Sequence, residues 1–176
     1  MATFEFTIIG TGLDPEAEDF ETRFYEAGCD DATISFQKGH ILVDFSREAE
    51  TLMAAIESAF LNVRAAGAVV ERVEPDPLVN LRDMAARSAM SPAALTNYHK
   101  GHRLDGFPPA KARVTTSSPL WDWADVAEWL YKHGRLDREI AMQAAAVSAA
   151  NDALECRGEF SVTFHERLDE RERAFA

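Results

Sequence analysis

The stretch LVNLRDMAARSAMSPAALTNYHK, residues 78–100, sets the organisation of the second half of this 176-residue chain. Asn80 can cap a short helix that carries Met84 on its apolar side. Ser91 followed by Pro92 is a second start signal, because a serine oxygen accepts from unpaired amides and proline fits the first helical position. We therefore expect two short helices joined by three residues.

The second of these helices has two distinct faces. Leu95 and Tyr98 are three positions apart, so they share one face and should pack on the first helix. The outward positions are Ala93, Thr96, Asn97 and Lys100. A short helix with small, amide and cationic side chains suits the major groove of DNA, where Asn can pair with adenine and Lys with guanine.

Positive charge gathers in the same region. The whole chain has a net charge of −12, which at first sight argues against binding nucleic acid. Residues 80–113, however, hold 6 Lys and Arg against 2 Asp and Glu, whereas residues 1–74 hold 5 against 15. The cationic residues are Arg82, Arg87, Lys100, Arg103, Lys111 and Arg113, with His99 and His102 among them. Each is either a phosphate contact or a solvated surface charge.

Four segments of this region together resemble the winged helix-turn-helix of MerR-like and excisionase-like regulators: LRDMAA (81–86), SPAALTNY (91–98), GFPP (106–109) and LWDWADVAEWL (120–130). The resemblance covers residues 78–131. It implies that residues 91–100 form a recognition helix in the major groove and that residues 111–118 form a β-wing against the DNA backbone.

A DNA-binding regulator of transcription is the function that this resemblance implies. The DNA-binding residues that follow from it are Ser91, Ala93, Thr96, Asn97, Lys100, Arg103, Lys111, Arg113, Thr115 and Ser117. One departure concerns Ala124, which stands where such proteins often have a capping Ser or Thr, so Asp125 is expected to serve the helix dipole instead. Trp121, Trp123 and Trp129 are expected in the core rather than at the DNA.

The first half of the chain alternates strand and helix patterns. Strands are expected at 3–9, 32–37, 41–45 and 68–73, and helices at 14–27 and 49–66. Lys38 and Gly39 join the second and third strands as a hairpin, and Gly28 ends the first helix. The order βαββαβ predicts an α+β fold in which residues 1–74 form a ferredoxin-like sandwich, with two helices on one face of an antiparallel sheet.

The segment Glu74-Pro75-Asp76-Pro77 reads as a domain boundary, because each proline disfavours helix in the residue before it. We expect an acidic sensor or interaction domain at 1–74, the winged helix-turn-helix at 78–134, and a C-terminal helix and tail at 135–176. In that tail Ile140, Ala144, Val147, Asn151 and Leu154 have the rhythm of a coiled coil. They predict either a homodimer contact or packing on the chain's own wing domain.

The C-terminal segment is expected to form one more strand. Phe160, Val162 and Phe164 alternate as in a strand, followed by a charged, frayed end at 166–173. The chain has no long apolar run and no basic segment before its first apolar stretch, so we expect neither a membrane span nor a signal peptide, and a cytoplasmic protein. Cys29 and Cys156 are expected as reduced thiols.

Catalytic and metal sites are not expected. His99 and His102 lack a third ligand nearby, whereas zinc normally has three or four protein ligands. Asp30 and Asp31 beside Cys29 read as surface acids after a helix end. We therefore expect no enzyme activity, cofactor or metal. Two other functions stay open: an antitoxin-like or adaptor protein whose acidic domain holds a partner protein, and a small-molecule sensor.

Overall fold

The computed structural model describes residues 1–156 and 159–175 and divides the chain into two compact units. Unit 1 contains Met1–Pro75 and Ala149–Leu168, and unit 2 contains Asp76–Ser148 and Asp169–Ala176. The division after Pro75 lies within the expected boundary segment. The C-terminal segment from 135 onward, expected as a helix and tail of its own, contributes residues to both units.

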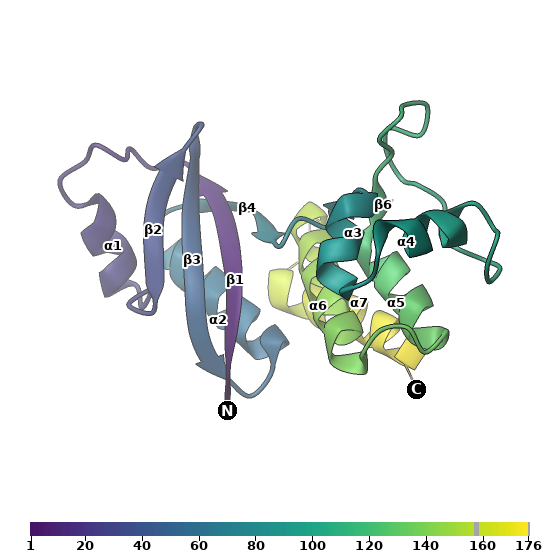
Figure 1. The fold of residues 1–176 in the computed structure, drawn as a ribbon. Coiled ribbons are helices and arrows are strands. Elements are labelled where there is room, and N and C mark those ends of the chain that lie inside the picture. Colours follow the sequence, from purple (N-terminus) through teal and green to yellow (C-terminus); the bar gives the residue numbers. More distant parts are fainter. Residues whose placement is uncertain (157–158, 176) are drawn as a thin grey trace. The chain divides into compact units, whose positions relative to one another are not determined.

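Unit 1 is built on a four-stranded antiparallel sheet (Figure 1). Its strands are β1 (Ala2–Thr11), β2 (Ala32–Gln37), β3 (His40–Ala49) and β4 (Val69–Glu74), in the order β2-β3-β1-β4. Helix α1 (Phe20–Glu26) follows β1, and α2 (Leu52–Ala65) follows β3. The expected α+β class and the element order βαββαβ are confirmed.

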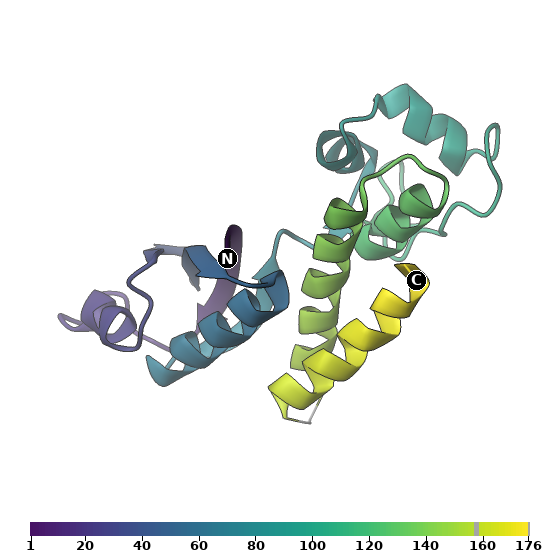
Figure 2. The same cartoon turned by 90° about the horizontal axis from the view of Figure 1, so that it is seen from below.

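Alternation along the central strands builds the core of unit 1. Phe6 pairs with Phe45 and Ile8 with Val43, and all four side chains are buried on the same face. Helix α2 runs along one side of the sheet, as Figure 2 shows, and it buries Ile56, Phe60 and Val63 among other residues. The opposite face has Glu5, Thr7 and Asp44 and is largely polar. The period of two therefore separates a core face from a wet face.

Helix α1 is shorter than the expected 14–27. Residues before Phe20 form turns, in which Asp14 Oδ1 accepts from the Glu16 N–H at 3.0 Å and the Asp14 carbonyl accepts from the Ala17 N–H at 3.2 Å. The acidic side chain competes with the helical pattern by bonding its own backbone two residues on. Gly28, with φ of 90°, follows the helix as expected.

The hairpin between β2 and β3 forms as expected. Lys38 and Gly39 both have positive φ, 51° and 86°, which is the geometry of a two-residue type I′ turn. Thr51 caps α2 by accepting from the Ala54 N–H at 3.1 Å, so this helix starts three residues after the expected position.

Unit 2 combines short helices with a two-stranded sheet. Strands β5 (Leu78–Val79) and β6 (Trp121–Asp122) pair antiparallel. Helices α3 (Leu81–Ser88) and α4 (Pro92–His99) lie at the expected positions, and α5 (Trp123–Lys132) begins earlier than expected. Met84, Leu95, Trp121, Val126 and Leu130 are fully buried and form the core of this unit.

The strand expected at Phe160–Phe164 is wrong, because this segment is helix α7 (Phe160–Glu172), followed by a 3-10 turn at Arg173–Phe175. Phe160, Phe164 and Leu168 are buried, whereas Val162 is 53% exposed. The true apolar period is therefore four rather than two, and the charged end at 166–173 is helical instead of frayed. An alternation of three residues is too short to distinguish the two periods.

The proposed coiled-coil segment is helix α6 (Arg138–Glu155). Val147 is 5% exposed within this chain, and Asn151 bonds the backbone of β4. Val147 is therefore buried within the chain itself, in the unit that contains residues 78–134, and a homodimer contact at this position stays a prediction. None of the helices in the described ranges has the length and apolar character of a membrane span.

Candidate nucleic-acid interface

Helices α3 and α4 each begin with the expected cap. The Asn80 side chain accepts from the N–H groups of Arg82 and Asp83, at 2.8 and 3.0 Å, and Asp83 accepts in return from the Asn80 N–H at 3.0 Å. Ser91 Oγ accepts from the Ala94 N–H at 3.2 Å. A cap of this kind stabilises a helix by about 1 kcal/mol, so the sequence defines both starts locally.

The turn between the two helices is set by one residue. Ala89 has φ of 54°, in the left-handed region, and ends α3. Three residues, Ala89 to Ser91, separate the helices, as expected. The left-handed residue reverses the chain within a short distance, which lets α4 pack across α3.

The face of α4 divides as the spacing indicates. Leu95 and Tyr98 are 0% and 5% exposed, which confirms that this side is packed. On the other side Ala93 and Lys100 are exposed, and Thr96 and Asn97 are half-buried. The Thr96 hydroxyl donates to the Pro92 carbonyl at 2.8 Å, so it is already engaged with its own helix.

The loop from residue 111 to residue 120 replaces the expected β-wing. A single bridge closes it: the Ala112 N–H donates to the Leu120 carbonyl at 3.1 Å, and the Leu120 N–H donates back at 2.9 Å. Beyond the bridge the chain turns on Arg113, whose carbonyl accepts from the Thr116 N–H and hydroxyl. The exposed residues of this loop include Arg113, Val114, Thr115 and Ser117. The wing is thus a loop with one bridge rather than a two-stranded ribbon.

Lys111, predicted as a DNA contact, lies in an ion pair within unit 2. Its Nζ lies 2.8 Å from Asp122 Oδ2 and 3.4 Å from Asp125 Oδ2. Burial opposes the charge of this ammonium, but the hydrogen bonds and charges of the two carboxylates outweigh it and raise the pKa of Lys111. The residue ties the base of the loop to the start of α5.

Asp122 is the functional cap of α5 and was also missed. Its Oδ1 accepts from the N–H groups of Ala124 and Asp125, at 2.8 and 3.3 Å. The N-cap of α5 is therefore Asp122 and its first residue is Trp123, whereas the resemblance places the cap at Ala124 and the first helical residue at Asp125. Ala124 lies inside the helix, where no capping side chain is needed. An Asp directly before the helical pattern was the signal available in the sequence.

The tryptophans support the loop that follows α4. Trp121 Nε1 donates to the Pro108 carbonyl and Trp129 Nε1 to the Asp105 carbonyl, each at 3.1 Å. Phe107 packs edge-on against Trp129, with ring centroids 5.1 Å apart. All three tryptophans are at most 8% exposed, which confirms their expected place in the core.

The cations of residues 80–113 differ in their surroundings. Lys100 and Arg103 are exposed at and just after the end of α4, and Arg113 is exposed on the loop. Arg87 instead lies over the ring of Trp123, and its guanidinium carbon is 5.8 Å from the ring centroid.

Among the described residues there is no group of three or more His, Cys, Asp or Glu side chains with metal-site geometry.

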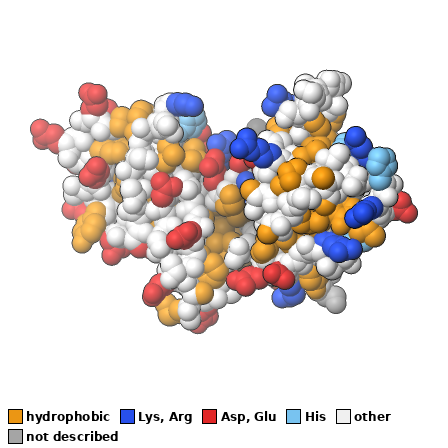
Figure 3. All heavy atoms as spheres, in the orientation of Figure 1, with side chains coloured by type: hydrophobic (Ala, Val, Ile, Leu, Met, Phe, Trp, Pro, Cys, Tyr) orange, Lys and Arg blue, Asp and Glu red, His pale blue; other side chains and the backbone are white. Residues whose placement is uncertain are grey.

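The net charge of the chain resides in unit 1. Counted along the sequence, unit 1 holds 7 Lys and Arg against 19 Asp and Glu, and unit 2 holds 11 of each. On the face drawn in Figure 3, most Lys and Arg side chains belong to unit 2.

Comparisons of the chain with family models, curated proteins and solved structures give no match in any of the three.

Proposed function

We propose that this chain is a cytoplasmic regulator of transcription that binds duplex DNA through α4 and the loop at 111–120. The observation that carries this proposal is the helix pair: α3 and α4 are joined by three residues with Ala89 left-handed, and α4 exposes Ala93 and Lys100. The resemblance of residues 78–131 to MerR-like winged helix-turn-helix proteins supports the same assignment.

The exposed side of α4 suits a major groove. A groove about 12 Å wide admits one helix, and small side chains allow the helix backbone to approach the bases. Ala93 and the Thr96 methyl would meet thymine methyls, and Asn97 would pair with adenine. Since Thr96 already donates its proton to Pro92, its methyl is the part left for DNA.

Phosphate contacts fall to the exposed cations and hydroxyls. Lys100, Arg103 and Arg113 are the candidates for charge neutralisation, whereas Lys111 is paired with Asp122 and Asp125. Ser91, Thr115 and Ser117 can contribute hydroxyl contacts, which position a protein on the duplex without reading sequence. Binding by one such module is expected to be weak, so we propose a homodimer on two half-sites.

The fold assignment belongs to the same proposal. We propose a ferredoxin-like sandwich for unit 1, on the order βαββαβ and the sheet order β2-β3-β1-β4. For unit 2 we propose a helix-turn-helix in which the loop closed by the Ala112–Leu120 bridge stands in place of the wing. Ferredoxin-like domains are found in proteins with many different functions. The fold proposed for unit 1 is therefore compatible with both small-molecule sensing and protein interaction.

The test is selection of bound sequences from random duplexes, followed by fluorescence anisotropy. We expect one enriched motif, and loss of binding when Asn97, Lys100 and Arg103 are changed to alanine together. The matched control is Lys38→Ala, which removes one exposed cation from the β2–β3 turn of unit 1. Failure to enrich any sequence with folded protein would refute the proposal, and light scattering measures the oligomeric state.

A further inference from the structure

The two edges of the sheet in unit 1 are treated differently by the chain. On β4, Asn151 Oδ1 accepts from the Val73 N–H at 2.8 Å, and Asn151 Nδ2 donates to the Val73 carbonyl at 2.9 Å. This strand also carries Glu71, Arg72 and Glu74, and charges discourage pairing with other strands. The β4 edge is therefore protected.

No residue in the described part of the chain protects the β2 edge in this way. Its sequence, Ala-Thr-Ile-Ser-Phe-Gln, contains neither a charge nor a proline, and in the described part of the chain β2 pairs with β3 alone. Phe36 is 45% exposed at this edge. An uncharged, unpaired edge strand with an exposed aromatic is a template for one more strand.

The register shows which backbone groups are available. The Asp31 carbonyl accepts from the Ser46 N–H at 3.0 Å, so Asp31 and Ser46 form a hydrogen-bonded pair. Bonded pairs alternate along an antiparallel ladder, and the following residues of β2 bonded to β3 are therefore 33, 35 and 37. The N–H and C=O groups of Ile34 and Phe36 point away from β3, toward the open edge.

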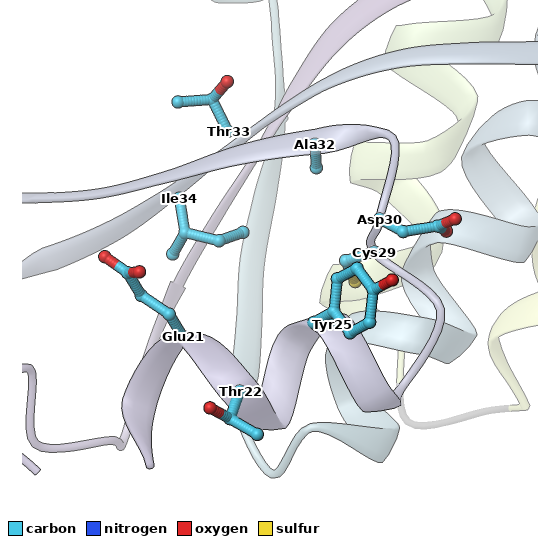
Figure 4. Close-up of a pocket in the computed structure, with 8 residues that line it drawn as sticks. All are labelled: Glu21, Thr22, Tyr25, Cys29, Asp30, Ala32, Thr33 and Ile34. Atoms are coloured by element: carbon cyan, nitrogen blue, oxygen red, sulfur yellow. The ribbon is translucent and has the colours of Figure 1, made fainter. Parts of the chain in front are cut away.

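A groove lies beside this edge. It is a cavity of about 530 Å³ between α1 and β2, lined among others by Glu21, Thr22, Tyr25, Asp30, Ala32 and Ile34. Figure 4 shows Glu21 and Tyr25 on α1 and Ile34 on β2 with their side chains turned toward the space between helix and strand. Tyr25 is 69% exposed. The two ionisable carboxylates of the lining, Glu21 and Asp30, make it acidic.

Arg47 fixes the turn from α1 into β2, beside the groove. Its guanidinium donates to Asp31 through Nε and Nη2, both at 2.8 Å, and to the Gly28 carbonyl at 2.9 Å. The same group donates to Asn62 on α2 at 2.8 Å. The turn from α1 into β2 is therefore fixed to the sheet and to α2, so the groove is formed before any ligand arrives.

We infer that this groove takes an extended, basic segment of a partner protein, which adds to β2 as a fifth strand of the sheet. Main-chain bonds to Ile34 and Phe36 would provide affinity, and Glu21 and Asp30 would select Lys or Arg at alternate positions. The charge of unit 1, with 19 acids against 7 cations, attracts such a segment and repels a second copy of the same unit. This inference does not depend on DNA binding.

The probe is a fluorescein-labelled peptide of alternating lysine and valine, longer than β2, measured by anisotropy against the full chain. Two further versions are N-methylated at every second residue, one in each phase. Only the phase whose N–H groups face β2 should lose affinity, by about tenfold or more, since it alone loses ladder bonds. A glutamate–valine peptide should not bind.

The variant that tests the acids is Glu21→Gln with Asp30→Asn. We expect this double variant to lower the affinity for the lysine–valine peptide about fivefold, with a larger effect at low salt than at high salt. The matched control is Glu5→Gln with Glu48→Gln, which removes two exposed acids from the opposite, polar face of the same sheet and should leave affinity within about twofold.

Three results would overturn the inference: no binding of the lysine peptide at millimolar concentration, equal effects of the two methylation phases, or equal effects of the two double variants. Analytical ultracentrifugation provides a fourth. If the chain were a dimer and the Phe36→Lys variant dissociated it, the β2 edge would be the interface with a second copy of this chain. Failure of DNA selection, in contrast, would affect only the function proposed for unit 2.

Discussion

Asn151 supplies both hydrogen bonds of an absent neighbouring strand to Val73, from a position 78 residues further along the chain. A side-chain amide has one acceptor and one donor, the same pair that a backbone residue offers across a ladder. It satisfies the N–H and C=O groups of Val73 together, on a strand edge that would otherwise face other chains.

Replacing Asn151 by Leu should destabilise the protein by about 1–3 kcal/mol, because the N–H and C=O of Val73 lose their partners. The loss is expected although leucine favours helix more than asparagine does. Chemical denaturation followed by circular dichroism measures it. Val162→Ala, on the exposed side of α7, is the control and should change the free energy of unfolding by less than about 0.5 kcal/mol.

The Asp31–Arg47 pair should make stability fall in acid. Hydrogen bonds from Arg47 lower the pKa of Asp31 below its ordinary value of 3.8, against the opposing effect of burial. A depressed folded-state pKa adds stability above pH 3.8, and this contribution is lost as pH falls through the folded value. Asp31→Asn should remove this part of the pH dependence; unfolding curves of both proteins between neutral and acidic pH that stay parallel would contradict it.

Alanine variants of Lys111 and Lys100 should have different effects, the first on stability and the second on DNA binding. Lys111→Ala should lower the thermal stability of unit 2, because Asp122 and Asp125 lose their shared cation, and should change the salt dependence of DNA binding little. With Lys100, Arg103 and Arg113 as contacts, log affinity should fall with log salt at a slope of about −3 per protomer. Lys100→Ala should reduce that slope by about one without a change in melting temperature. If Lys111→Ala instead reduced the salt slope and Lys100→Ala lowered the melting temperature, Lys111 rather than Lys100 would be the phosphate contact.

The two cysteines should differ in reactivity. Burial raises the pKa of the Cys29 thiol to about 11, so almost no thiolate is present at neutral pH. Cys156 is partly exposed. Iodoacetamide followed by peptide mass mapping should therefore label Cys156 first in the native protein, and both residues after denaturation. Rapid native labelling of Cys29 would mean that α1 opens readily.

The acids of unit 1 should oppose non-specific DNA binding. Changing Glu5, Glu16, Glu18 and Glu48 together to glutamine removes four exposed charges and keeps residues 149–168 of unit 1 in place. Affinity for random duplex should rise, most at low salt, because exposed charges within a Debye length of about 10 Å at 0.1 M salt repel phosphate. The ratio of specific to random binding should stay nearly constant. Weaker binding at low salt would refute this role.

The sequence by itself determined the features that depend on a few neighbouring residues. The caps at Asn80 and Ser91, the turn at Lys38 and Gly39, and the buried faces of β1 and β3 all follow from local bonding or from the period of the apolar residues. The order βαββαβ and the positions of α3 and α4 were predictable for the same reason.

Only the tertiary structure decided which distant residues meet. The bond of Asn151 to Val73, the pairing of Lys111 with Asp122, and the hydrogen bonds of Arg47 to Asp31 join positions from 11 to 78 residues apart. No local rule identifies such partners, because a polar side chain is satisfied by any suitable group that folding brings within reach. The strand predicted around Phe164 was wrong for a related reason: only the burial of Phe160, Phe164 and Leu168, with Val162 exposed, shows that the apolar period there is four rather than two.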